Sequence, residues 1–262
     1  MTSQAAVLKT SPRQNISIEK FVYLIVLGFT IVSMLCLAIV HITDATWRYF
    51  SDADGGSSQL ALALIECALG VIAIHVPSII SRLLKIKMPS ALCIAFYLFL
   101  LCAIPLGEVF SFYYRFPFWD SMLHFLSGFM LWMLGGLLLV HYLRKKKCAD
   151  LINPAFVGII ALLFAASVCL AWEFYEFALD SLFGLNMQKA MLEDGTTLIG
   201  RAALFDTMKD LILGFLGAMI ATVSLSPSLK NRNGWLYSFG LRNKSEKAGV
   251  LCTPERALPE SA

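Results

Sequence analysis

Three strongly apolar segments of this chain each carry polar side chains that can bind a metal ion or transfer a proton. Within each segment these residues are three, four or seven positions apart, so they share one face of a helix. Ionisable groups inside membrane-length helices are costly, rarely face lipid and normally converge on the interior of a bundle. The sequence therefore predicts one site built from three helices. Its residues are Asp120 and His124, then Glu173, Glu176 and Asp180, then Asp206 and Asp210.

The types of these side chains indicate the chemistry. Oxygen-rich ligation with a single nitrogen suits hard or borderline divalent ions: Mg²⁺, Mn²⁺, Ca²⁺, Zn²⁺ or Fe²⁺. A bound cation would also offset repulsion among carboxylates that otherwise must share protons. A divalent metal ion is thus the expected cofactor, with a set of ligands that are also the expected catalytic groups: Asp120, His124, Glu173, Glu176, Asp206 and Asp210. Substrate binding is expected from Glu108, Asp180 and Arg201, the arginine as a second counter-charge or as a clamp for an anionic headgroup.

Taken singly, several of these residues have a simpler explanation. Capping of a helix N-terminus at the interface would account for Asp120 or Asp206. Ordinary packing with a hydrogen bond would account for His124. Glu173 and Glu176 within one membrane helix are harder to explain in this way. If no metal binds, the same residues are expected to form a protonated, hydrogen-bonded carboxylate cluster.

The elements that must position these residues are membrane helices. Of the 262 residues, 58% are hydrophobic and only 15% are charged, and the mean hydropathy is +0.72, which excludes an average soluble domain. Apolar runs of membrane-spanning length predict an all-α, polytopic helix bundle in contact with lipid. Six transmembrane helices are expected at 21–42, 59–80, 91–110, 120–143, 155–182 and 206–224, in a domain at 19–225. The residues at 1–18 and 226–262 are expected to be disordered tails, and the loop at 183–205 is long enough for a short re-entrant or interfacial helix.

The charged residues of the loops predict the orientation. Sixteen lysines and arginines fall in the two tails and in the loops after the second and fourth spans, and five fall on the other side. Cytoplasmic loops of membrane proteins carry this excess. Both termini are therefore expected in the cytoplasm, with the site facing the extracytoplasmic side of the cytoplasmic (inner) membrane. Because the basic residues are sorted by loop, topology explains them and nucleic-acid binding is not expected.

At the same residues the chain resembles a known family. The stretches DSMLH at 120–124, WEFYEFALD at 172–180, GR at 200–201 and DTMKDLILGFLGA at 206–218 resemble the YjdF-like family of bacterial inner-membrane proteins. More loosely they resemble the VanZ-like family, which is associated with teicoplanin resistance. Glu176 and Asp210 stand where VanZ-like proteins tend to have glutamine and asparagine, which favours the YjdF-like group. The resemblance covers about 120–221 and implies a six-helix membrane protein, but no settled activity.

Three functions remain open at this point. The first is a metal- or acid/base-dependent hydrolase or transferase that acts on a membrane or envelope lipid at headgroup depth. The second is an accessory protein whose cavity binds an envelope lipid or a small anionic ligand without turnover. The third is a transporter of cations or protons, although the sequence shows no inverted repeat to support it. The sequence does not indicate an oligomeric state.

Overall fold

Helices make up nearly all of the protein that the computed structural model describes, namely residues 17–51, 57–86, 88–146, 153–192 and 196–226. Six helical stretches are long and apolar enough to cross a membrane, which confirms the expected class of fold. The two expected tails lie almost entirely outside the described residues. The elements are α1 (Ile18–Ser51), α2 (Ser57–Ala73), α3 (Val76–Leu84), α4 (Ser90–Leu101), η1 (Cys102–Val109), α5 (Phe112–Arg115), α6 (Trp119–Lys145), α7 (Pro154–Phe183) and α8 (Arg201–Leu225).

The first helix is longer than its apolar stretch. The segment at 44–50 was expected to be a loop, and it is helical as far as Ser51. No glycine or proline occurs between Gly28 and Gly55, so the sequence offers no residue that would end the helix earlier. The hydrophobic pattern located the span but not the end of the helix.

Two prolines shape the second and third spans. Pro77 lies in the first turn of α3, just after the break that separates α2 from α3, a position where its missing N–H costs nothing. Pro105 lies inside η1, a π-helix that continues α4. Because Pro105 has no N–H to donate to the preceding turn, the regular ladder is interrupted there, and its carbonyl accepts from the amide of Phe110 five residues on.

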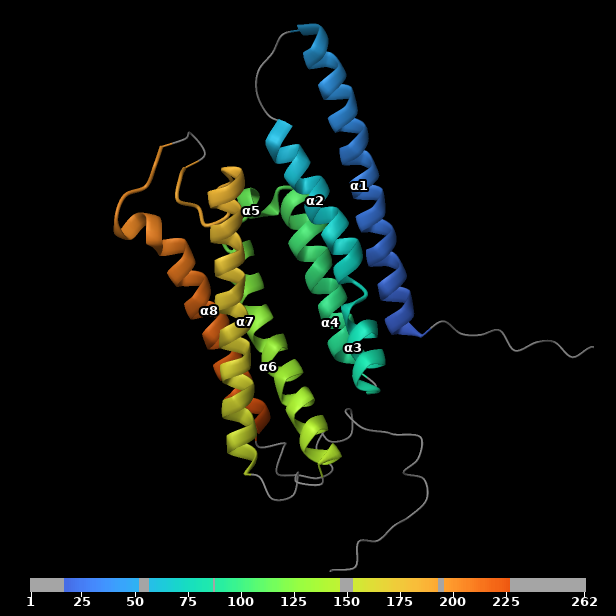
Figure 1. Cartoon of the computed structure of the whole chain (residues 1–262), viewed down its shortest axis with the longest axis vertical. Coiled ribbons are helices and arrows are strands. Elements are labelled where there is room, and N and C mark those ends of the chain that lie inside the picture. The colour runs from blue at the N-terminus through green and yellow to red at the C-terminus, as the bar shows by residue number, and fades with distance from the viewer. Residues whose placement is uncertain (1–16, 52–56, 87, 147–152, 193–195, 227–262) are drawn as a thin grey trace, which may run out of the picture.

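Helices α6, α7 and α8 lie side by side in one half of the bundle, and α1 to α4 form the other half (Figure 1). Small residues allow α6 and α8 to touch through their backbones. A Cβ at Gly128 would overlap the carbonyl oxygen of Gly214, and a Cβ at Gly217 would overlap that of Phe125. Such close approach is the usual means of association where lipid removes the hydrophobic drive.

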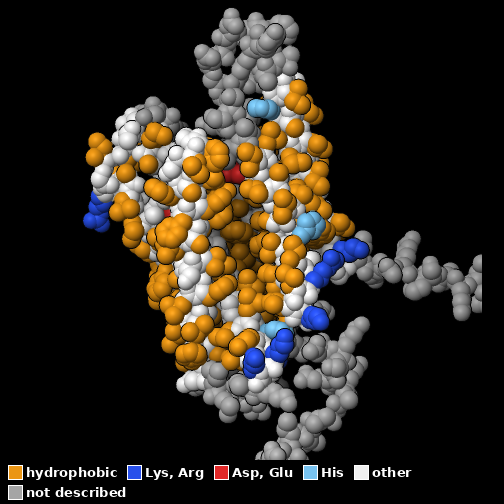
Figure 2. Space-filling view, in the orientation of Figure 1, with side chains coloured by type: hydrophobic (Ala, Val, Ile, Leu, Met, Phe, Trp, Pro, Cys, Tyr) orange, Lys and Arg blue, Asp and Glu red, His pale blue; other side chains and the backbone are white. Residues whose placement is uncertain are grey.

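The exterior of the bundle is apolar, as contact with lipid requires. Figure 2 shows hydrophobic side chains over most of the middle of this face. Large residues of α1, α7 and α8 remain exposed, among them Val32, Phe174 and Val223. The buried carboxylates among the described residues belong instead to α7 and α8, and they are Glu173, Glu176, Asp206 and Asp210. The protein therefore contacts the lipid bilayer with its apolar surface and keeps these acids inside.

Candidate functional site

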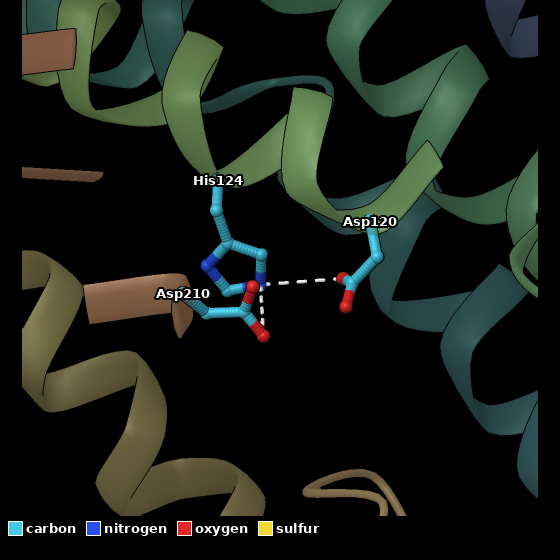
Figure 3. Close-up of side chains that lie close together, drawn as sticks. All are labelled: Asp120, His124 and Asp210. Carbon is cyan, nitrogen blue, oxygen red and sulfur yellow. Dashed lines mark ion pairs between the residues drawn. The ribbon is translucent and has the colours of Figure 1, made fainter. Parts of the chain in front are cut away.

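Asp120, His124 and Asp210 face one another in the site (Figure 3). The first two lie one turn apart on α6, and Asp210 reaches them from α8. His124 Nε2 is 3.4 Å from Asp120 Oδ1 and 3.7 Å from Asp210 Oδ2. One ligand atom from each residue lies within 4.8 Å of the other two. Neighbouring ligands of a divalent ion with bonds of about 2.1 Å are about 3.0 Å apart, so small side-chain rotations would complete a three-ligand set.

Two lysines, Lys189 and Lys209, pair with the other oxygens of the same two aspartates. Asp120 turns Oδ1 toward His124, and its Oδ2 accepts a hydrogen bond from Lys189 Nζ. Asp210 turns Oδ2 toward His124, and Lys209 Nζ lies 3.6 Å from its Oδ1. The atoms that face one another across His124 are therefore not the atoms that pair with the lysines. A metal ion could bind the two aspartate oxygens that face His124 while Lys189 stays paired with Asp120 and Lys209 with Asp210.

Asp206 holds both lysines in place. It lies one turn before Asp210 on α8, and its Oδ1 accepts a hydrogen bond of 2.7 Å from Lys209. Lys189 Nζ is 3.4 Å from both oxygens of the same carboxylate. Burial alone would lower the pKa of Lys189, but the adjacent carboxylates of Asp120, Asp206 and Asp210 raise it above its ordinary value. Lys189 is therefore charged at neutral pH.

Asp180 fixes the loop that carries Lys189. Its two carboxylate oxygens accept hydrogen bonds from the backbone amides of Met187 at 2.7 Å and Gln188 at 3.0 Å. The side-chain amide Nδ2 of Asn186 donates to the carbonyl of Met191 and so closes the same loop. Its described residues contain an isolated antiparallel bridge and no helix, so the short helix that the loop length allowed is not found there. The role of Asp180 in substrate binding remains a prediction.

Glu173 and Glu176 extend the site along α7. Both are buried, and His124 is an electrostatic neighbour of each. Glu176 Oε1 accepts a hydrogen bond of 2.7 Å from the indole of Trp172. Glu173 Oε2 is buried without a hydrogen-bond partner. These two acids are thus close to the three-residue group without belonging to it.

The predicted substrate-binding residues Glu108 and Arg201 lie outside the group of Asp120, His124 and Asp210. Glu108, in the last turn of η1, has Asp120 and Lys189 as electrostatic neighbours, whereas Arg201 begins α8 and is exposed. The phenol of Tyr113 is near four carboxyl groups, including Glu108 and Asp120. Burial and these charges raise its pKa well above the ordinary value, so it remains a hydrogen-bond donor. Whether Glu108 and Arg201 contact a substrate remains a prediction.

The helix boundaries exclude helix capping as the explanation for Asp120 and Asp206. Phe118 is the N-cap of α6, which places Asp120 inside the first turn, and α8 starts five residues before Asp206. Neither aspartate therefore caps a helix. Asp206 and Asp210 occupy successive turns on the side of α8 that faces α6, because Gly214 and Gly217 of that side touch the α6 backbone.

Lys189 and Lys209 are functional candidates that reasoning from the sequence missed, because it counted them only as loop charges. A signal existed for Lys209. It is three residues from Asp206 and adjacent to Asp210, so a side-chain pair on one helix face was predictable. Lys189 had no comparable signal. It is 69 residues from Asp120 in a loop without periodicity, and only the folded loop brings the two together.

This architecture defines the protein as a polytopic membrane helix bundle with an ionisable site at one end of three helices. The chain belongs to the family described as predicted membrane protein (DUF2238), whose model matches residues 22–231. The YjdF-like proteins are in this family, so that part of the resemblance is confirmed, while the match gives no specific support to the VanZ-like family. No curated protein and no solved structure matches the chain.

Proposed function

We propose that this protein is a divalent-metal-dependent hydrolase or transferase that acts on a lipid of the membrane or cell envelope. The observation that carries the proposal is the arrangement of Asp120, His124 and Asp210, whose ligand atoms lie within 4.8 Å of one another. Two oxygens and one imidazole nitrogen are a donor set that binds divalent ions. His124 is five residues into α6, about 8 Å below its start, a depth that suits a lipid headgroup.

The residues of this group have separate roles in the proposal. Three protein ligands leave coordination positions for water and substrate, and the ion would polarise the bond under attack and activate the water. Glu173, whose Oε2 has no hydrogen-bond partner, accepts the proton of the attacking water or hydroxyl group. The same proton then passes to the oxygen of the leaving group. Asp206 positions the two lysines.

Chelation tests the metal site. Purified full-length protein in detergent should contain a divalent metal and should melt at a lower temperature after treatment with EDTA, because the ion binds only the native state. At a metal concentration of about 100 times Kd, the stabilisation is about 2.7 kcal/mol, or about 5–10 °C. The variant Asp210→Asn should lose this response.

The matched control is Glu19→Gln, which removes a carboxylate at the opposite end of the bundle, in the first turn of α1, and should respond to EDTA as the unchanged protein does. A protein that contains no metal and melts identically with and without EDTA would contradict the metal site. The residues would then form the hydrogen-bonded carboxylate cluster.

The site is proposed to face the extracytoplasmic side, on the basis of the loop charges. A single cysteine at Thr197, in a chain whose seven native cysteines are replaced, should react with a membrane-impermeant maleimide in intact cells. A cysteine at Lys146, beyond the opposite end of α6, should react only after the cells are opened. The reverse pattern would place the site in the cytoplasm.

Ligand binding without turnover is the second candidate, since it would use the same residues. Turnover is the observation that separates the two. Transport is less well supported, because the buried carboxylates of the described residues all lie toward the end of the bundle where α6 and α8 begin. A path across the membrane needs ionisable groups at further depths.

A further inference from the structure

We propose that Lys189 and Lys209 bind a phosphate group in the headgroup of the lipid, and that they do so only when the metal ion is bound. The proposal rests on the proposed function and identifies the class of its substrate. It uses two cations that the metal site itself does not need. Lysine ammonium groups are established ligands of phosphate oxygens, to which they offer up to three N–H donors each.

The two ammonium groups converge on one place. Lys189 Nζ donates to Asp120 and lies 3.4 Å from Asp206. Lys209 Nζ lies 2.7 Å from Asp206 and 3.9 Å from Asp120. Because both cations contact the same two carboxylates, they are close to each other and can hold one anion together.

The side chains of Lys189 and Lys209 also lie nearer to the protein surface than the other side chains of the site. The side chain of Lys189 is 41% exposed and that of Lys209 is 26% exposed, whereas that of Asp210 is 2% exposed. The order from the surface inward is therefore lysines, then Asp120 and His124, then Asp210. A ligand that enters from the surface therefore meets the lysines first.

Charge makes anion binding depend on the metal. With Asp120, Asp206 and Asp210 ionised and His124 neutral, these carboxylates and the two ammonium groups sum to one negative charge, which repels an anion. A divalent ion on the inner oxygens changes this sum to one positive charge. The buried Asp210 Oδ1 accepts no hydrogen bond and has only the longer ion pair with Lys209 Nζ at 3.6 Å, so this carboxylate is incompletely paired. A phosphate oxygen on the ion and another on a lysine would complete the site.

The surroundings favour a lipid over free phosphate. On α8, beside the helix face that carries Lys209, the apolar side chains of Phe205, Met208 and Ile212 are exposed. They are spaced at three and four residues and form one lipid-facing strip. Acyl chains can lie along this strip while the headgroup reaches the lysines.

The test is isothermal titration of the full-length protein in detergent with dihexanoyl phosphatidic acid. The matched probes are dihexanoylglycerol, which lacks the phosphate, and inorganic phosphate, which lacks the acyl chains. Each titration is made with Mn²⁺ and again with EDTA. We expect phosphatidic acid to bind at least about tenfold more tightly with Mn²⁺ than without, and more tightly than either matched probe. Lys189→Gln and Lys209→Gln should each weaken this binding about tenfold or more, and the exposed Lys145→Gln at the other end of α6 should not.

The rise in melting temperature with Mn²⁺ separates this proposal from the previous one. A variant that keeps that rise has a folded metal site, so its loss of phosphatidic acid binding reports the lysines. If Mn²⁺ stabilises the protein but the lysine variants bind phosphatidic acid unchanged, the phosphate proposal is wrong while the metal site stands. Equal binding of inorganic phosphate would overturn the lipid as the source, and equal binding of dihexanoylglycerol would overturn phosphate recognition. If Mn²⁺ gives no rise, both proposals fail.

Discussion

Replacement of Gly128 by leucine should separate α6 from α8 and abolish the metal response together with the native packing. The contact that it breaks is between backbones, because a Cβ at this position overlaps the carbonyl oxygen of Gly214. No change of rotamer relieves such an overlap, so the cost should exceed the usual 1–3 kcal/mol of overpacking. A loss of about 4 kcal/mol corresponds to a melting temperature roughly 8–16 °C lower.

The same glycines set the geometry of the site. His124 is one turn before Gly128 on α6, and Asp210 is one turn before Gly214 on α8, so the glycine contact holds these two side chains at one level. The smaller change Gly128→Ala introduces the same Cβ, so it should also push α6 away from α8, by less than leucine does, and should weaken the binding of Mn²⁺. Leucine at Gly28 of α1, where a Cβ meets nothing within 4 Å, is the matched control and should melt within about 2 °C of the unchanged protein. If Gly128→Leu melted like this control, the described packing of α6 on α8 would be wrong.

Removal of the Asp206 carboxylate should destabilise the protein more than removal of the whole ion pair. Asp206→Ala leaves Lys209 and Lys189 facing each other with less compensating charge. Breaking a buried ion pair costs about 3–5 kcal/mol, and the partial exposure of the two lysines places this case near the lower end. The double variant Asp206→Ala with Lys209→Met should recover at least about 1 kcal/mol of that loss.

Thermal unfolding of the four proteins in this double-mutant cycle, with EDTA present, gives the coupling without a contribution from metal. Lys145→Met, at the exposed end of α6, serves as the control and should change the stability by less than about 0.5 kcal/mol. Additive losses from Asp206→Ala and Lys209→Met would show that the two side chains do not interact in the folded protein.

The sequence by itself determined the class of protein and the polar faces of three helices. Membrane-length apolar runs fixed the six spans, because a backbone in lipid has few alternatives to the helix. The four-residue spacings of Asp120 with His124 and of Asp206 with Asp210 placed each pair on one helix face. Gly214 and Gly217 follow Asp210 four and seven residues later in the sequence, and small residues at this spacing indicate a close helix contact. These signals come from residues close together in the chain, so they can be read directly from the sequence.

The tertiary structure alone decided how the site is divided. Of the six expected ligands, it brings the ligand atoms of Asp120, His124 and Asp210 within 4.8 Å of one another. The contact between α6 and α8 at Gly128 and Gly214 sets which turns of these two helices lie at the same level. The tertiary structure also brings Lys189 to Asp120 across 69 residues through a loop that Asp180 holds by two backbone amides. A loop without periodicity gives no signal in the sequence of which distant residues its side chains will contact. For that reason Lys189 became a functional candidate only in the folded protein.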